Sequence, residues 1–144
     1  MIKIICVGKV KESYLRDGIA DYVKRIGKYH KIEIIELSDS NINDERDKIL
    51  KHICNKDFNI ALSIEGEELS STEFANKVDK IFISYPNITF IIGGSDGIHD
   101  DIKKICNYSL SFSKFTFPHQ LFRMILLEQI YRAFKILNNE TYHK

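Results

Sequence analysis

The chain has 144 residues, 44% of them hydrophobic, and a formal net charge of +1, so it is long enough for one domain with a substantial core and too short for two. It has no apolar run of the ~20 residues that a membrane helix needs, no small-residue cleavage site behind Met1–Val10, and three cysteines too far apart for a zinc site or a disulfide framework. We therefore expect a single cytoplasmic domain over residues 1–144, with no membrane segment, no bound metal and reduced, mostly buried thiols.

The first half of the chain alternates short apolar runs with helical patterns. Ile2–Gly8 is an apolar run closed by glycine, which is typical of a strand buried on both faces. From Glu12 to Tyr29 apolar residues recur at spacings of three and four, which predicts one helix ending near Gly27. Lys31–Leu37 alternates well enough for a second strand, and the narrow apolar stripe of Asn43–Cys54 predicts a short, highly charged helix.

The second half continues this alternation. Phe58–Ile64 predicts the third strand, and Ser70–Phe82 predicts a helix with Ser70 or Ser71 as its N-cap and Glu73 downstream. Ile88–Ile92 is the fourth strand, Ile98–Cys106 a short helix and Leu110–Phe112 the fifth strand. Five alternations of strand and helix predict one α/β domain with a mainly parallel sheet and flanking helices.

The last predicted helix, His119–Leu137, is apolar around most of its circumference. Only Glu128, Arg132 and Lys135 form a clear polar strip. A helix that is apolar on two sides has to be covered on two sides, so we expect one face on the sheet and the other against a second copy of the chain. The alternative is a helix wedged deep within its own domain.

The charges are distributed unevenly along the chain. Residues 1–31 hold eight Lys/Arg against three Asp/Glu, residues 32–101 hold six against fifteen, and residues 102–144 hold seven against two. If the two basic ends meet in space, they form a positive face that suits a phosphate backbone. Solvated helix faces with chance clustering are an equally good explanation of the charges alone.

The segment Gly93–Gly97 (GGSDG) follows the fourth strand, at the end of a parallel sheet where ligands bind. It has neither the spacing of a phosphate-binding NTPase loop nor that of the dinucleotide fingerprint. Spacing alone favours a tight strand-to-helix turn over a ligand contact. Asp96 is also a candidate N-cap for the next helix.

Several motifs, taken in chain order, resemble a known family. They are the glycine turn, residues 110–120 (LSFSKFTFPHQ), residues 127–136 (LEQIYRAFKI) and the terminal Tyr142-His143-Lys144, with VGK at 7–9 and YVKR at 22–25 in support. Together they resemble the RlmH family, the bacterial ribosomal RNA large subunit pseudouridine N3-methyltransferases of the SPOUT class. The resemblance covers nearly the whole chain.

The resemblance implies a SPOUT fold, with a C-terminal trefoil knot over approximately residues 60–144. It implies S-adenosylmethionine as cofactor, a homodimer through the last helix, and N3 of a pseudouridine in 23S rRNA of the assembled ribosome as the methyl acceptor. The positions that match the family's cofactor contacts are Leu62, Gly93, Phe112, Ser113, Lys114, Phe115, Thr116 and Phe117. Glycines and backbone amides suit such a ligand, because they allow close approach without charged side chains.

The matched C-terminal motifs also suggest residues for the acceptor side. We expect Tyr142 and His143 to act in catalysis with Arg132, and Lys144 and His119 to bind substrate, in the cleft of the same subunit or of its partner. The alternatives are a frayed tail, a His119 that caps the last helix or fixes the preceding loop rather than acting as a base, and an Arg132 that only pairs with Glu128 one turn away.

Two departures from the family pattern are visible. Glu67 and Glu68 follow Gly66 where the family usually has Lys, and the segment Ser38–Leu50 is shorter than is common, which we interpret as a trimmed surface loop. Two other functions remain open on the sequence: a SPOUT methyltransferase acting on another RNA, and a non-catalytic flavodoxin-like binding module.

Overall fold

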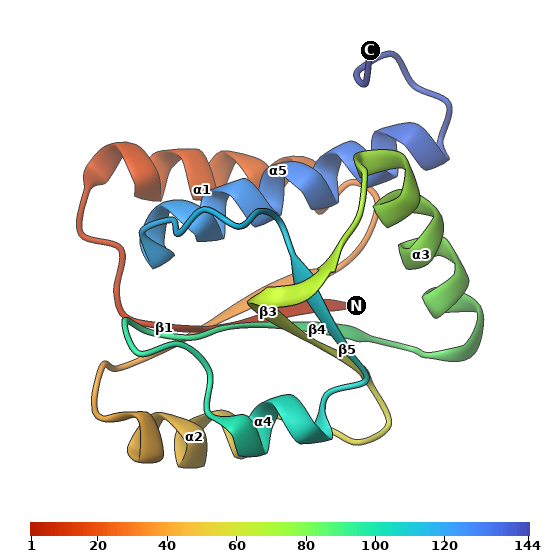
Figure 1. Ribbon diagram of the computed structural model, residues 1–144. Coiled ribbons are helices and arrows are strands. Elements are labelled where there is room, and N and C mark those ends of the chain that lie inside the picture. The colour runs from red at the N-terminus through yellow and green to blue at the C-terminus, as the bar shows by residue number, and fades with distance from the viewer.

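A sheet of five strands forms the centre of the computed structural model, which describes residues 1–144 (Figure 1). The strands are β1 (Ile2–Val7), β2 (Ile32–Leu37), β3 (Phe58–Glu68), β4 (Ile88–Ile92) and β5 (Tyr108–Ser111). They lie in the order β2-β1-β4-β3-β5, and every neighbouring pair is parallel. The predicted α/β domain with a parallel sheet is confirmed.

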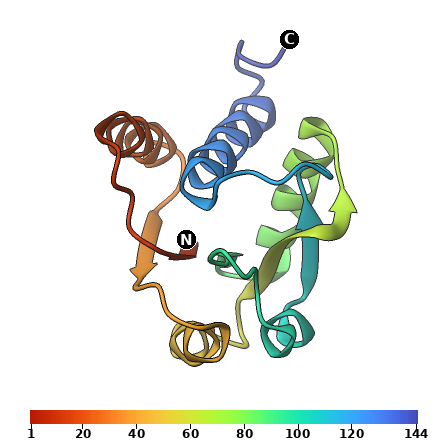
Figure 2. The same cartoon turned by 60° about the vertical axis from the view of Figure 1, so that its left-hand side comes forward.

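Helices cover both faces of the sheet. They are α1 (Ser13–Ile26), α2 (Ile42–Leu50), α3 (Ser71–Ser84), α4 (Asp100–Ile105) and α5 (His119–Leu137). Figure 2 shows α1, α5 and α3 side by side on one face and α2 and α4 on the other. The larger of two apolar cores lies under α1, α3 and α5, and the smaller lies under α2 and α4. No helix combines the length and hydropathy that a membrane crossing requires.

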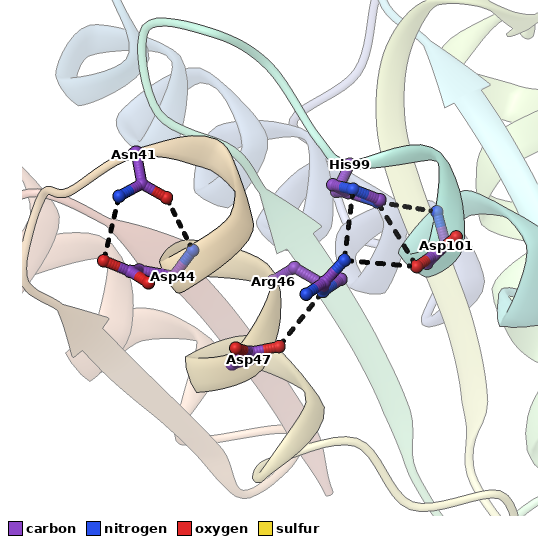
Figure 3. Close-up of polar contacts among 6 residues, drawn as sticks. All are labelled: Asn41, Asp44, Arg46, Asp47, His99 and Asp101. Carbon is purple, nitrogen blue, oxygen red and sulfur yellow. Dashed lines mark hydrogen bonds and ion pairs between the residues drawn. The ribbon is translucent and has the colours of Figure 1, made fainter.

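The apolar runs predicted as strands are buried on both faces. All five residues of β4 are buried, and the four residues from Ile4 to Val7 of β1 are fully buried as well. The predicted serine cap of α3 is confirmed, and α2 begins at a cap that the sequence analysis did not name. Ser70 and Glu73 form a reciprocal capping box at α3, and Asn41 accepts the backbone N–H of Asp44 at α2 (2.9 Å; Figure 3).

Arg46 of α2 connects the two helices on the lower face of Figure 1, and Figure 3 shows this contact. Its Nη1 lies 3.4 Å from Nε2 of His99 and 3.4 Å from the carboxylate of Asp101, and its Nε donates to Asp47 (3.0 Å). Nδ1 of His99 accepts the backbone N–H of Asp101 (3.0 Å) and so caps α4. The prediction of Asp96 as that cap is wrong, because the helix begins later than its apolar pattern suggested.

Strand β3 is longer than predicted and continues past Gly66 to Glu68. It pairs with β5 up to Leu62, bulges, and pairs again at Glu67 and Glu68. A Cβ on Gly66 would lie 2.7 Å from backbone atoms of Ser109 and Leu110. Glycine at this position therefore permits the backbones of β3 and β5 to approach each other this closely. The trefoil knot, which depends on how the C-terminal part is threaded here, stays a prediction.

Two smaller predictions are wrong. Helix α2 ends at Leu50 rather than near Cys54, because its apolar stripe is too narrow to support a longer helix. All three cysteines are free, and Cys6 is buried with a pKa raised to about 11 by desolvation, but Cys54 is exposed. Cys54 lies beyond the end of α2 in the turn before β3, where no apolar layer covers it.

Helix α5 is covered on two sides by its own domain. It packs against α1 and against α3 as well as on the sheet (Figure 2). Packing within the domain therefore accounts for most of its two-sided apolar pattern, which was the alternative interpretation. Leu121, Phe122, Ile125 and Ile136 remain half-buried. Association of two copies through α5 stays a prediction.

Candidate functional site

A cavity of about 440 Å³ lies beyond the carboxyl ends of β3, β4 and β5. This is the end of a parallel sheet where ligands bind. The bulged part of β3, the ends of β4 and β5 with the loops that follow them, and the start of α5 form its walls. The lining segments are 62–65 in the bulge of β3, 92–98 at and after the end of β4, and 110–113 with 115–119 at and after the end of β5, together with Lys103 and Phe122.

The structure brings most of the predicted cofactor residues to this one cavity. Those that line it are Leu62, Gly93, Phe112, Ser113, Phe115, Thr116 and Phe117. Lys114 is exposed and does not line the cavity. The ring of Phe122 packs edge-on against Phe112 (centroids 5.0 Å apart) and stacks with Phe117 (5.9 Å), so one wall is aromatic.

The glycine turn forms the opposite wall and has a structural reason for its composition. A Cβ on Gly93 would lie 2.4 Å from the carbonyl oxygen of Gly97, so any side chain at this position would force the turn open. The turn closes through a hydrogen bond from the N–H of Gly97 to the oxygen of Gly94 (3.0 Å). Close backbone packing therefore explains the glycines, and it also leaves backbone amides at the cavity wall.

The bulge of β3 adds residues that the sequence patterns did not indicate. The Glu65 carboxylate accepts a hydrogen bond from the Ser63 hydroxyl and pairs with Lys103 (3.4 Å) across the cavity mouth. These hydrogen bonds, the one from Ser63 first, lower the pKa of Glu65. Ile64 and Phe115 are largely exposed apolar side chains at the same mouth. The only sequence signal for this region was the glycine that follows the apolar run of the third strand.

His119 lines the cavity as the first residue of α5. The N-cap of this helix is Pro118, and no side chain caps it. The alternative that His119 caps α5 is therefore wrong.

The remaining predicted residues gather at the far end of α5. Arg132 pairs with Glu128 (2.9 Å), which also accepts the phenol hydrogen of Tyr142 (2.8 Å). Arg132 Nη1 lies 3.1 Å from Nδ1 of His143, and the Tyr142 ring packs edge-on against Tyr131. Burial, with the bond to Glu128, raises the pKa of Tyr142 to about 12. The tail is thus docked on α5 through Tyr142 and His143, while Lys144 is exposed.

This tail cluster and the cavity do not meet within one subunit. His119 and Arg132 are thirteen residues apart on one helix, which corresponds to about 20 Å at 1.5 Å per residue. His119 at the first turn of α5 lines the cavity, whereas Figure 1 shows the C-terminus beyond the last turn of this helix. Within a single chain, the predicted cofactor residues and the predicted tail residues form two separate groups.

Comparison with known proteins gives consistent matches over the whole chain. Residues 1–143 match the family described as "Predicted SPOUT methyltransferase". The ribosomal RNA large subunit methyltransferase H of Clostridium beijerinckii is 48% identical and that of Streptococcus uberis 47%, and each alignment covers 99% of both chains. A putative ribosomal RNA large subunit methyltransferase H from Methanococcus maripaludis is 48% identical over the same share.

Solved structures support the same fold. A probable methylase family protein from Haemophilus influenzae has a TM-score of 0.59 and 15% identity, with 99% of this chain and 70% of that one covered. A tRNA (m1G37) methyltransferase from Aquifex aeolicus has a TM-score of 0.55 and 16% identity, with 91% and 69% covered. The full-length matches favour an enzyme over a flavodoxin-like binding module. The chain belongs to the SPOUT methyltransferase family, with ribosomal RNA large subunit methyltransferase H proteins as full-length relatives.

Proposed function

We propose that this methyltransferase transfers the methyl group of S-adenosylmethionine to N3 of a pseudouridine in 23S rRNA of the assembled ribosome. The observation that carries the proposal is the full-length identity of 46–48% with proteins named for methylation of large-subunit ribosomal RNA. The acceptor atom and the cofactor follow from the motifs at 93–97, 110–120 and 142–144 that resemble the RlmH family.

The cofactor occupies the cavity at the ends of β3, β4 and β5. Its aromatic wall and its backbone-rich glycine wall suit a flat heterocycle that is recognised through hydrogen bonds to main-chain groups. We assign contacts with it to the eight positions named from the family pattern. Six of these positions are Phe112 to Phe117, of which only the exposed Lys114 does not line the cavity.

The reaction itself is an in-line displacement at carbon. The N3–H bond of the acceptor breaks and leaves its electron pair on nitrogen, which forms the bond to the methyl carbon. The carbon–sulfur bond breaks at the same time, and its electrons return to sulfur to give the neutral thioether. Alignment of donor and acceptor therefore supplies much of the rate, and removal of the N3 proton supplies more.

The tail residues act across a homodimer in this proposal. Because the tail docks about 20 Å from the cavity along its own α5, it needs a second subunit whose α5 runs in the opposite direction. A two-fold axis across α5 places the C-terminal end of one helix beside the N-terminal end of the other. Arg132, Tyr142, His143 and Lys144 of one subunit then approach the cavity of its partner.

The proposal is tested by incubating the protein with methyl-labelled S-adenosylmethionine and three substrates: ribosomes, deproteinised ribosomal RNA and bulk tRNA. We expect label in 23S rRNA and only with ribosomes. Label in tRNA would instead favour a SPOUT enzyme with another RNA substrate. Absence of label in every RNA, with the cofactor bound, would refute the RNA methyltransferase proposal.

A further inference from the structure

A polar recess lies beside the cavity where β1 ends. Gly8 follows β1 and has a φ of +94°, and a Cβ built on it would lie 3.2 Å from Nε2 of His119 and 3.2 Å from Oδ1 of Asp39. Two side chains from distant elements therefore converge on the space that this glycine leaves open. Only glycine supplies both the left-handed conformation and the missing side chain without strain.

The imidazole of His119 is free in this recess. No hydrogen bond within the chain engages its ring, and only the neighbouring Gln120 is tied down, through the backbone N–H of Lys11 (3.3 Å). The rings of two other histidines have polar partners. His99 caps α4, and His143 lies against Arg132. His119 is the histidine that lines the cavity, and an imidazole is the side chain most often used for proton transfer in enzymes.

A buried arginine holds the recess in shape. Arg123 lies one turn further along α5 and is only 1% exposed. Its Nη2 donates to the carbonyl oxygen of Gly8 (3.0 Å), and its Nη1 pairs with Glu36 of β2 (2.6 Å). Burying a guanidinium is unfavourable unless its partners are well placed. These contacts fix the start of α5, and with it His119, against the ends of β1 and β2.

The surface next to the recess suits RNA. Lys9 and Lys11 follow Gly8 in the β1–α1 loop and are exposed, and Tyr14 at the start of α1 is 70% exposed. Lysines that position a phosphate backbone beside an aromatic ring that can stack on a base are a common arrangement in RNA-binding proteins. The loop that follows Gly8 therefore exposes side chains that can contact an RNA strand.

We propose that the acceptor base enters the cavity beside this recess and that His119, which lines the cavity, is the residue that removes its imide proton. This inference rests on the proposed function and adds to it the proton acceptor and the side of approach. The N3–H bond breaks, its electron pair stays on N3, and the proton goes to Nε2 of His119. N3 then forms the bond to the methyl carbon as the carbon–sulfur bond breaks. Asp39 pairs with the resulting imidazolium, and Arg123 is a positioning residue.

The test compares His119→Gln with wild type on ribosomes, with His52→Gln as the matched control. His52 lies at the opposite end of the sheet, near the start of β1, where its backbone oxygen accepts from Lys3. We expect His119→Gln to lower kcat by about 100-fold or more at neutral pH, while calorimetry with S-adenosylmethionine gives an unchanged Kd. His52→Gln should match wild type in both measurements.

The pH profile separates a base from a structural residue. The charged groups around the recess are Asp39, Arg123 with Glu36, and the two lysines of the β1–α1 loop. As the pH approaches the pKa of the acceptor imide, the imide ionises without help, so the deficit of His119→Gln should shrink. Added imidazole should partly restore His119→Ala.

Three outcomes would overturn the inference while wild type stays active: full activity of His119→Gln at neutral pH, a deficit that is the same at every pH, or no rescue of a folded His119→Ala by imidazole. Thermal unfolding checks that the variants are folded, and His119→Asn serves as a second replacement if the glutamine variant is not. If wild type itself methylates no ribosomal RNA, the proposed function fails instead.

Discussion

Replacing Gly93 by alanine tests the close packing of the glycine turn. Its new Cβ would lie 2.4 Å from the carbonyl oxygen of Gly97, whereas ordinary contacts begin at 3.4 Å. The turn would have to open by about 1 Å, and since the obstacle is backbone it cannot rotate away. Overpacking of this kind costs about 1–3 kcal/mol. For a chain of this size, that lowers the Tm by roughly 2–4 °C per kcal/mol.

The assay is thermal unfolding with and without S-adenosylmethionine. Gly93→Ala should lower the Tm by roughly 2–12 °C and should lose most of the stabilisation that the cofactor gives wild type, because the cavity wall moves. Gly97→Asn is the matched control. Gly97 has a φ of +78°, which asparagine tolerates, and a Cβ there would meet nothing within 4 Å. A Gly93→Ala protein with the Tm and cofactor affinity of wild type would refute the reasoning.

Three further predictions concern other parts of the chain. Ser70→Ala removes the capping box of α3 and should lower the free energy of unfolding in urea by about 1 kcal/mol, whereas Ser70→Asp, which caps equally well, should not. Deleting residues 142–144 should abolish methyl transfer while the protein stays folded and keeps its cofactor affinity. Mixing this variant with Gly93→Ala should restore activity if the tail acts across the dimer, and full activity of the truncated protein would refute any role of the tail. His30 stacks on Phe82 and Phe134, and burial lowers its pKa in the folded protein. On acidification, the unfolded chain therefore binds a proton at His30 at a higher pH than the folded chain does. Stability should therefore fall as the pH drops below the ordinary histidine value of about 6.5, and His30→Phe should reduce that dependence; equal pH profiles of Tm for the two proteins would contradict it.

The sequence predicted best where one local rule decides the structure. Ile88–Ile92 has the bounds of β4 because a short run of four apolar residues and one threonine between polar turns is typical of a strand buried on both faces. The start of α3 was predictable because its serine cap and glutamate are three residues apart in sequence. The bounds of α5 agree as well, since its apolar residues persist from the histidine after Pro118 to Leu137.

Features that depend on distant contacts were not predictable in this way. The end of β3 carries Gly66, Glu67 and Glu68, which no strand pattern favours, and it forms because the backbone of β5 crosses there. Arg123 is an isolated charge in an apolar helix, and periodicity gives no reason to bury it. Its partner Gly8 is 115 residues away, so only the fold explains the contact.

In the candidate site, too, local patterns predicted some features, and others depend on contacts between distant parts of the chain. Periodicity located the glycine turn at a strand end, but it favoured a structural turn over a ligand contact. The assignment of Phe112 to Phe117 to one cofactor site came from resemblance to a family. In the structure, these two segments line one cavity together with the bulge after Leu62. Neither the periodicity nor the family resemblance had indicated the residues of this bulge beyond Leu62.

The central claim is tested most directly by the identity of the methylated nucleoside. Ribosomes from cells with and without pseudouridine at the target helix of 23S rRNA are incubated with the protein and S-adenosylmethionine, and the rRNA is digested to nucleosides for mass spectrometry. We predict N3-methylpseudouridine from the modified ribosomes, and little or no methylated nucleoside from ribosomes that carry uridine there. Equal methylation of both ribosomes, or a methyl group on another base, would contradict this account.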